Sequence, residues 1–170
     1  MIRLATLNDI NEIMPMIIEG RKHIQTYNIS QWINGYPSVD TITQDINNNR
    51  GYVLIDNDEI IGYFVVLKYD PCYDNIDGKW IDDSDYVAIH RTVTKYFNKG
   101  LGSKMFDEIK KYYDHIRVDT HEGNISMNKC LLKNNFKYCG IIKLESGDLR
   151  NAYEYVKWKD ILVNQLTHFL

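Results

Sequence analysis

Between residues 86 and 113 the chain reads YVAIHRTVTKYFNKGLGSKMFDEIKKYY. The first part of this segment is rich in β-branched side chains and predicts a strand from Tyr86 to Thr94. Two glycines, Gly100 and Gly102, come next. Apolar residues also recur at helical spacing, at Leu101, Met105, Phe106, Ile109 and Tyr113. The segment therefore predicts a strand, a tight glycine loop and an amphipathic helix.

The rest of the chain predicts further strands and helices around this segment. On its N-terminal side we expect a strand over 2–5, helices that begin near Thr6 and Ser38, and strands over 52–55 and 60–67, followed by an irregular acidic stretch. On its C-terminal side we expect a strand over 116–119, a helix over 124–134 and a hairpin of 136–144 with 151–158. This order of elements is typical of an α/β domain with a mixed sheet.

Length and composition indicate one globular domain. The chain has 170 residues, of which 44% are hydrophobic and 25% are charged. We expect a single domain over residues 1–160. The tail over 161–170 has the apolar spacing of a short helix.

Charge and cysteine content exclude several classes of partner. The net charge of -3 argues against binding to nucleic acid or to an anionic membrane surface. No apolar run reaches the roughly 18 residues that span a bilayer, and the N-terminus lacks the apolar core of a signal peptide. The cysteines Cys72, Cys130 and Cys139 form no Cys-x-x-Cys pair, which favours a reducing cytoplasm over a disulfide framework.

The glycine loop suits an anion such as a phosphate. Glycines let the backbone approach an anion closely, and the N-terminus of the following helix stabilises negative charge. A dinucleotide fingerprint would need a third glycine where Met105 stands, and a P-loop would need Gly-Lys-Ser/Thr where Gly102 is followed by Ser103. The alternative is that the glycines only shape a tight connection between strand and helix.

Several runs around the loop resemble one known family. The strand reads Ile89-His90-Arg91-Thr92-Val93, and the loop reads Lys99-Gly100-Leu101-Gly102. Further runs are Asp119-Thr120-His121-Glu122-Gly123-Asn124 with Met127, Lys133-Asn134-Asn135-Phe136, Tyr138-Cys139-Gly140-Ile141-Ile142 and Arg150-Asn151-Ala152-Tyr153-Glu154. Together they resemble the GNAT superfamily of acetyltransferases, in particular a small bacterial subgroup with an Ile-His-Arg strand and an Asp-Thr-His turn. The likeness covers most of the chain and is firmest from Tyr86 to Tyr155.

This resemblance implies a fold and a cosubstrate. The expected fold is a mixed, largely antiparallel sheet of about seven strands flanked by about four helices, with a splayed strand pair for coenzyme A. Acetyl-CoA would be the acyl donor, and no metal is implied. The implied acetyl-CoA contacts are Thr92, Val93, Thr94, Asn98, Lys99, Gly100, Leu101, Gly102, Ser103, Asn124 and Met127. The strand ending at Val93 would pair its backbone with the pantetheine arm, and amides over 98–103 would hold the pyrophosphate. The resemblance leaves a homodimer open.

The chain departs from the family pattern at three positions. Phe97 stands where the loop usually has Gln or Arg, which leaves the backbone amides as the binding groups. Leu131 stands where many members place a tyrosine acid. Asn135 replaces a glycine, a mild change because Asn tolerates the left-handed conformation.

The implied chemistry favours a general base. An alkylamine with a pKa of about 10.4 is neutral in only roughly one molecule in a thousand at neutral pH. His90 has the side chain whose pKa suits this task. The alternative is that His90 and Arg91 alternate across the strand, one in the core and one in a salt bridge. The leaving thiolate needs less help, and Tyr153, Tyr138 or a water could replace the missing tyrosine.

Other candidate residues have structural explanations beside functional ones. A metal-binding His-Glu-x-x-His helix that began at His121 would need a second histidine at the position of Ile125. We therefore interpret His121 as a turn residue. We assign His23 to a solvated helix face and Cys130 to buried packing. The acidic run over 82–85 either attracts a cationic amine or is a solvated loop. Four aromatic residues lie in regions that shape the acceptor pocket of this family. Either they hold an amine by cation–π contact or they belong to the core: Trp32, Tyr36, Tyr73 and Trp80.

The leading functional hypothesis is an N-acetyltransferase. It would move the acetyl group of acetyl-CoA to a primary amine of a small molecule or peptide, by direct attack in a ternary complex. One alternative is a catalytically silent acyl-CoA-binding module, which the missing tyrosine favours. The other is a structural α/β domain, which leaves the glycine loop without a ligand.

Overall fold

Eight strands form one sheet in the computed structural model, which describes residues 1–157. The strands are β1 (Ile2–Leu4), β2 (Gly51–Asp56), β3 (Glu59–Leu67), β4 (Ile76–Gly78), β5 (Val87–Thr94), β6 (His115–Thr120), β7 (Lys137–Lys143) and β8 (Leu149–Val156). They lie in the order β1-β2-β3-β5-β6-β8-β7-β4, and every neighbouring pair is antiparallel except β5 with β6. The expected mixed, largely antiparallel sheet is confirmed. The tail over 161–170 lies outside the described residues.

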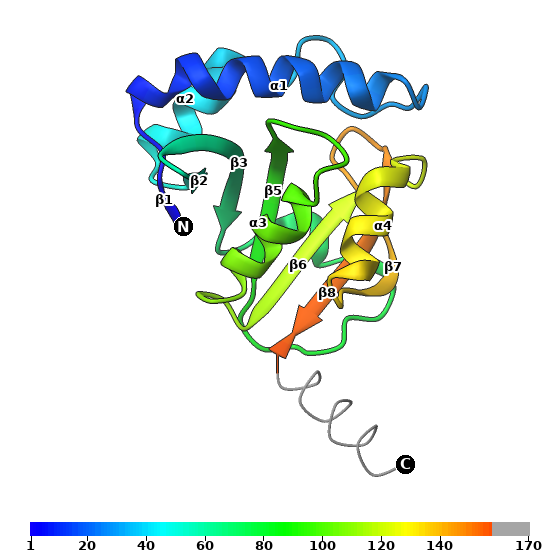
Figure 1. The fold of residues 1–170 in the computed structure, drawn as a ribbon. Helices are drawn as coiled ribbons and strands as arrows, with labels where there is room; N and C mark the ends of the chain where they lie inside the picture. The colour runs from blue at the N-terminus through cyan, green and yellow to red at the C-terminus, as the bar shows by residue number, and fades with distance from the viewer. Residues whose placement is uncertain (158–170) are drawn as a thin grey trace.

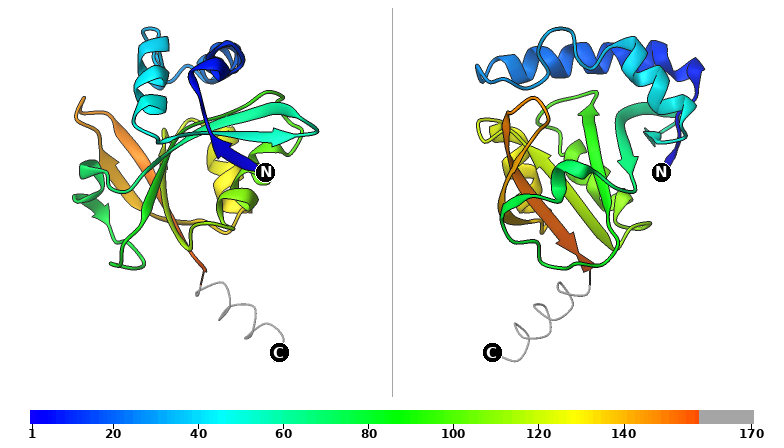
Figure 2. Two further views of the ribbon diagram at one scale, coloured as in Figure 1. Left: turned by 90° about the vertical axis from the view of Figure 1, so that its left-hand side faces the viewer. Right: turned by 180° about the vertical axis from the view of Figure 1, so that it is seen from behind.

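Four α-helices cover the two faces of this sheet. They are α1 (Ile10–Gln25), α2 (Val39–Asn47), α3 (Leu101–Ile109) and α4 (Ile125–Lys133). Figure 1 shows α3 and α4 in front of the sheet and α1 running across its upper end. In the turned views of Figure 2, α1 and α2 lie together above the strands. No helix among residues 1–157 is both long and apolar enough to cross a membrane.

The helix starts follow the polar residues that the sequence indicates. The backbone N–H of Thr6 donates to Asp9 Oδ2 at 2.7 Å before α1 begins. Ser38 Oγ accepts from the backbone N–H of Thr41 at 3.2 Å at the start of α2. Asn124 Oδ1 accepts from the backbone N–H of Met127 at 3.2 Å at the start of α4. The Ser38 and Asn124 side chains satisfy N–H groups that a helix leaves without partners in its first turn, whereas the Asp9 side chain binds the backbone just ahead of α1.

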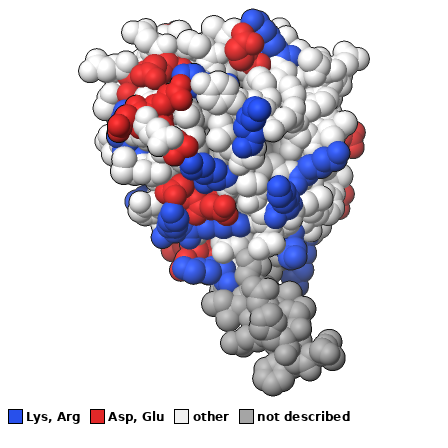
Figure 3. Space-filling view, in the orientation of Figure 1, with Lys and Arg blue, Asp and Glu red and all other residues white. Residues whose placement is uncertain are grey.

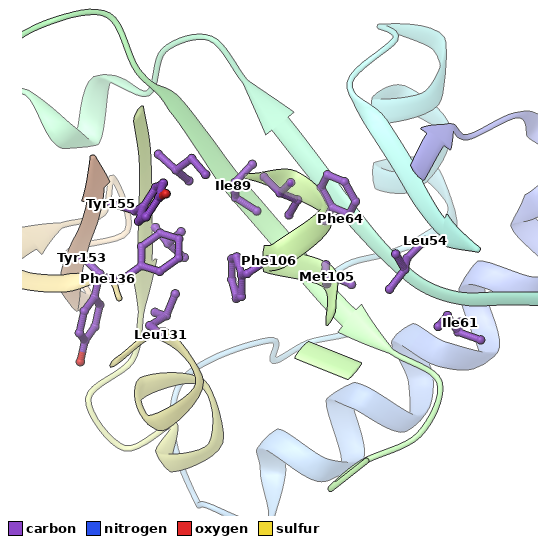
Figure 4. Close-up of a cluster of buried hydrophobic side chains, with 13 residues drawn as sticks. Leu54, Ile61, Phe64, Ile89, Met105, Phe106, Leu131, Phe136, Tyr153 and Tyr155 are labelled. Atoms are coloured by element: carbon purple, nitrogen blue, oxygen red, sulfur yellow. The ribbon is translucent and has the colours of Figure 1, made fainter. Parts of the chain in front are cut away.

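Alternation along β3 divides the core between the two faces. Tyr63 points into the cluster formed with α1 and α2, and the next residue, Phe64, points into the cluster formed with α3 and α4. Figure 4 shows the second cluster, in which Phe106 of α3 lies near Phe136. Their ring centroids are 5.1 Å apart. Both helix layers are therefore fixed to the same central strands.

The parallel pair β5 and β6 separates soon after it forms. Val87 pairs with Ile116 and Ala88 with Arg117, and no further pair follows. On the other side of β5, the register against β3 shifts beyond His90, where β5 carries an extra residue. Arg91 in this bulge has a φ of +51°. The bulge and the separation leave an opening between the C-terminal ends of β5 and β6.

Two details differ from the sequence prediction. The stretch expected to be irregular contains β4, which pairs with β7 at the sheet edge. Gly78 and Gly140 allow this contact, because a Cβ on Gly78 would lie 2.2 Å from the carbonyl oxygen of Cys139. In addition, α3 ends at Ile109, so Tyr113 lies beyond the helix, although its side chain still packs against the same core.

Candidate active site

A cavity of about 500 Å³ lies at the opening between β5 and α4. We call it the loop cavity. Its lining includes every residue expected to contact acetyl-CoA except Lys99: Thr92, Val93, Thr94, Asn98, Gly100, Leu101, Gly102, Ser103, Asn124 and Met127. The structure therefore brings the β5 end, the glycine loop and the start of α4 to one place.

The glycine loop presents backbone donors to this cavity. Gly100 occupies the N-cap position of α3 with a φ of +74°, and no side chain caps the helix. The first N–H groups of α3 thus lack an intrahelical partner, and the helix dipole adds positive potential there. A Cβ on Gly102 would lie 2.9 Å from Cys130 Sγ, so a larger residue crowds α4. This geometry suits an anion held by amides.

Two lysines add positive charge to the wall of the loop cavity. Lys129 and Lys133 line it from α4. Within residues 1–157 neither of them forms a salt bridge. Figure 3 shows basic side chains, interspersed with acidic ones, across the face that carries α3 and α4. The two lysines are available to phosphate groups, and the sequence prediction did not include them.

A hydrogen-bonded bridge joins α1 to α4 at the loop cavity. His23 Nε2 lies 3.2 Å from Ser126 Oγ, and the hydroxyl of Tyr27 contacts the same Oγ. The His23 ring also stacks on Phe97, with centroids 4.5 Å apart. The assignment of His23 to a solvated helix face is therefore wrong. The spacing of Gly20 and His23 along one side of α1, continued by Tyr27 just beyond the helix, is the signal that could have placed His23 here.

A second cavity of about 500 Å³ adjoins the first. We call it the acceptor-side cavity. The two share the lining residues Ile24, Trp32, Thr92, Asn124 and Met127. The aromatic rings of Trp32 and Tyr36 contribute to its wall, as does His90 from β5. A molecule in one cavity therefore lies next to a molecule in the other.

His90 stands between two carboxylates in the acceptor-side cavity. Its Nε2 lies 3.0 Å from Asp70 Oδ2, and its Nδ1 lies 3.8 Å from Asp119 Oδ1. The Nε2 atom is buried, and Asp70 is off the direction of an N–H hydrogen bond. Burial works to raise the pKa of Asp70, but the contact with His90 and the backbone N–H of Cys72 outweigh it, and the pKa is lowered. The sequence prediction missed both carboxylates.

The neighbouring Arg91 has a structural role. Its guanidinium donates to both oxygens of buried Asp45, at 2.7 and 2.8 Å, and to the hydroxyl of Tyr36 at 2.8 Å. Burial works to lower the pKa of Arg91, but Asp45 and Tyr36 raise it above its ordinary value. Both residues line the acceptor-side cavity, so His90 is not the core residue that the alternative interpretation expected, while Arg91 is the expected salt-bridged residue.

Known structures identify the fold's family. An acetyltransferase of the GNAT family from Streptococcus agalactiae 2603 is 33% identical to this chain, with a TM-score of 0.85. The match covers 92% of this chain and 95% of that protein. The chain belongs to the GNAT family of acetyltransferases. Its sequence matches no protein-family model and no curated protein.

More distant GNAT structures share the fold. A GNAT-family acetyltransferase from Listeria monocytogenes 4b F2365 is 19% identical, has a TM-score of 0.60, and matches over 91% of this chain and 92% of its own. The enzyme AAC(6')-Ib, solved with paromomycin and acetyl-CoA, is 20% identical, has a TM-score of 0.65, and matches over 92% and 93%. At these identities the likeness extends to the fold alone.

The two tyrosines suggested as acids in this GNAT protein do not reach either cavity. The hydroxyl of Tyr153 donates to Asn128 Oδ1 at 2.6 Å, and burial raises the pKa of Tyr153. Figure 4 shows this hydroxyl directed away from the core cluster. Tyr138 is half exposed and packs edge-on against Tyr153. Leu131, at the position of the missing tyrosine, is fully buried in the same cluster.

The four aromatic candidates divide between cavity and core. Trp32 and Tyr36 line the acceptor-side cavity, which agrees with the interpretation of these residues as a pocket wall. Tyr73 and Trp80 are buried in a core cluster instead, and the Trp80 indole donates to the carbonyl of Tyr73 at 2.9 Å. The Tyr73 hydroxyl donates to Asp119 Oδ1 at 2.7 Å, so it fixes the position of a carboxylate that lines the acceptor-side cavity.

The remaining candidates have structural roles. His121 Nδ1 accepts from the backbone N–H of Gly123 at 3.0 Å, which confirms it as a turn residue. Burial raises the pKa of Cys130 and so favours the thiol over the nucleophilic thiolate. The acidic run over 82–85 contributes to neither of the two cavities. Residues 1–157 contain no group of three or more His, Cys, Asp or Glu side chains placed to hold a metal.

Proposed function

We propose that this GNAT protein is an N-acetyltransferase that moves the acetyl group of acetyl-CoA to a primary amine of a small molecule or peptide. The proposal rests on one arrangement: an anion-binding loop cavity adjoins a second cavity that contains His90. Direct transfer requires donor and acceptor side by side, and the two cavities share a wall. The binding of acetyl-CoA by AAC(6')-Ib, which has the same fold, supports acetyl-CoA as the donor.

The described residues fit acetyl-CoA along its length. The amides from Asn98 to Ser103 would hold the pyrophosphate, with Lys129 and Lys133 close to the phosphates. The edge of β5 from Thr92 to Thr94 has no β6 partner, so its backbone groups are open to the amides of the pantetheine arm. Asn124 and Met127 lie where the two cavities meet, which suits contact with the thioester end. Lys99 remains a candidate contact outside the cavity lining.

An amine that enters as an ammonium ion loses two protons on the way to the amide. Acetyl-CoA supplies an activated acetyl group as a thioester. We assign His90 as the base that takes the first proton, which frees the nitrogen lone pair to form a bond to the carbonyl carbon, and the second proton leaves as the amide forms. As the C–S bond breaks, its electron pair leaves with the CoA sulfur as thiolate. A thiolate with a conjugate pKa of about 8.5 leaves without a strong acid, so water can return the proton where Leu131 replaces the tyrosine.

Two measurements test this function. A thermal shift with acetyl-CoA checks cofactor binding, and it separates a CoA-binding protein from a structural domain without ligand. Release of free CoA thiol over a panel of primary amines checks transfer. We expect amine-dependent release above the hydrolysis background. Binding without any such release would favour the alternative of a catalytically silent acyl-CoA-binding module.

A further inference from the structure

Among residues 1–157, two carboxylates of the acceptor-side cavity, Asp70 and Asp119, have no lysine or arginine beside them, whereas a third, Asp148, lies 3.8 Å from Arg150. Asp70 and Asp119 each pair with His90. In the part of the chain that the structure describes, neither forms a salt bridge with a lysine or arginine. Their side chains are only 15% and 10% exposed. Since one imidazole cannot balance two carboxylates, the cluster stays anionic in either state of His90.

The arginines that line this cavity are committed to other groups. Arg91 is bound to Asp45 and to the Tyr36 hydroxyl. Arg150 donates to the carbonyl of Leu149 at 2.8 Å and to the carbonyl of Ser30 at 2.9 Å. Neither guanidinium pairs with Asp70 or Asp119, so the negative charge of these two carboxylates stays open to a ligand.

The two sides of the His90 ring face different surroundings. Asp70 Oδ2 lies 3.0 Å from Nε2, off the direction of an N–H hydrogen bond, and its negative charge favours the proton on that nitrogen because the carboxylate on the other side is farther away, at 3.8 Å. The lone pair is then on Nδ1, which faces Asp119 across 3.8 Å. A ligand nitrogen with several N–H groups can donate to both His90 Nδ1 and Asp119 Oδ1. The 3.8 Å between these two atoms is less than twice the length of an ordinary hydrogen bond, so both bonds can form at once.

We propose that the acceptor enters as a charged alkylammonium, which Asp119 binds and His90 Nδ1 deprotonates, while Asp70 positions the His90 ring. The inference rests on the proposed transferase function and names the acceptor class of its site. The ammonium loses one proton to Nδ1, and the neutral amine then attacks the thioester carbon. The second N–H proton leaves the nitrogen as the amide forms and passes through water to the departing CoA thiolate. Asp119 is held for this task by the Tyr73 hydroxyl at 2.7 Å, and Asp70 by the backbone N–H of Cys72 at 2.9 Å.

The walls of the cavity fit the same class of ligand. The rings of Trp32 and Tyr36 give it aromatic surface, which attracts cations and packs against hydrocarbon. A basic alkylamine offers both a cation and hydrocarbon. An arylamine or a hydroxyl compound offers no cation to Asp119.

The test uses benzylamine, which is an ammonium near neutral pH, and benzyl alcohol, its neutral analogue. Calorimetric titration of the CoA-bound wild type should show tighter binding of benzylamine. Asp119→Asn should weaken benzylamine binding by roughly ten- to hundredfold and leave benzyl alcohol unchanged. The amide keeps an oxygen for the Tyr73 hydroxyl, so the fold is preserved.

The kinetic arm separates the two carboxylates. With benzylamine as acceptor, Asp119→Asn should raise KM, whereas Asp70→Asn should lower kcat by about tenfold or more with little change in KM. The matched control is Asp74→Asn, a neighbouring carboxylate that accepts from the Tyr69 hydroxyl and lines neither cavity. It should leave both constants within about twofold.

Each outcome decides a separate question. Equal affinity of the wild type for benzylamine and benzyl alcohol overturns the ammonium site, as does full benzylamine binding by Asp119→Asn. Parallel loss of kcat in Asp70→Asn and Asp74→Asn overturns the positioning role. If CoA release stays at background while benzylamine still binds more tightly than benzyl alcohol, the transferase function is wrong. The cation site is supported in that case.

Discussion

Two histidines of this protein stand beside carboxylates at opposite ends of the β5–β6 pair. At the end where the strands separate, His90 lies between Asp70 and Asp119. At the end where they are paired, His115 Nε2 lies 2.5 Å from Glu154 Oε1. The groups look alike, yet His90 lines the acceptor-side cavity, which adjoins the loop cavity, whereas His115 lines neither of these two cavities.

The difference between the clusters is an arginine. Arg117 Nε donates to Glu154 Oε1 at 3.0 Å, and its guanidinium lies 4.1 Å from the ring centres of both Trp80 and Tyr86. Burial works to raise the pKa of Glu154, but His115, a backbone N–H and Arg117 lower it overall. A buried carboxylate with a fixed cation is complete and serves the fold. Carboxylates beside a histidine alone are open to a cationic ligand.

The sharpest test of this contrast exchanges the two histidines for asparagine. His90→Asn should lower kcat/KM by about 10²- to 10⁴-fold, because the proton acceptor is lost, and should leave stability nearly unchanged. Its counterpart His115→Asn should keep turnover and lower the free energy of unfolding by about 1–3 kcal/mol. Thiol-release kinetics and urea unfolding measure the two effects. Equal loss of activity in both variants would break the comparison.

The carboxylates offer the next test. Glu154→Gln leaves Arg117 buried without its countercharge, so the free energy of unfolding should fall by about 3–5 kcal/mol. Asp119→Asn, at the open end, should cost less than about 1 kcal/mol because no fixed cation loses its partner. Urea denaturation of both variants gives the values. A larger loss at Asp119 would mean that the cavity cluster also holds the fold together.

The same cluster predicts a pH dependence of stability. The pKa of Glu154 is lowered in the folded state, so the unfolded chain takes up the proton first as pH falls. The stabilisation from Glu154 is complete above its unfolded pKa of about 4.3 and is lost as pH falls through the folded pKa. Unfolding curves at stepped pH should therefore show the gap between wild type and Glu154→Gln narrowing in acid. A difference in the free energy of unfolding that stays constant with pH would mean that Glu154→Gln destabilises the fold through packing and not through charge.

At the open end, the smallest predicted effect concerns backbone binding. Gly102→Val should raise the Kd for acetyl-CoA by about tenfold, more than Ser103→Ala or any other single side-chain deletion in the loop. The valine crowds Cys130 Sγ, which a Cβ at this position already meets at 2.9 Å. The double variant with Cys130→Ala relieves that crowding and shows how much of the loss is due to packing. Normal acetyl-CoA binding by Gly102→Val would contradict the role of the loop.

Local signals predicted the parts of the fold that depend on neighbouring residues. Ser38 and Asn124 cap helices, and Asp9 binds the backbone N–H of Thr6, through bonds that span only three residues. The strand of 86–94 has its own β-branched pattern. The short strand β4 was missed, because its pairing depends on the close approach of Gly78 to a distant glycine. No local pattern marks such a contact.

The site was predictable only where it lies on one stretch of chain. The loop from Asn98 to Ser103 is contiguous, so its place beside the strand end followed from order alone. Asp70 and Asp119 come from segments far apart in sequence and meet at His90 only through the sheet order. For Tyr73 and Trp80 the sequence left a pocket wall and the core as alternatives, and only the tertiary structure places them in the core.

The bridge from α1 to α4 ties the two cavities together thermodynamically. His23 and Tyr27 contact Ser126 at the loop cavity, while Ile24, on the same turn of α1, borders both cavities. A ligand that changes the position of α1 in one cavity changes the wall of the other. By linkage, any factor by which the donor alters acceptor affinity is the factor by which the acceptor alters donor affinity. Under the proposed transferase function, we therefore expect donor binding and acceptor binding to be coupled through this helix.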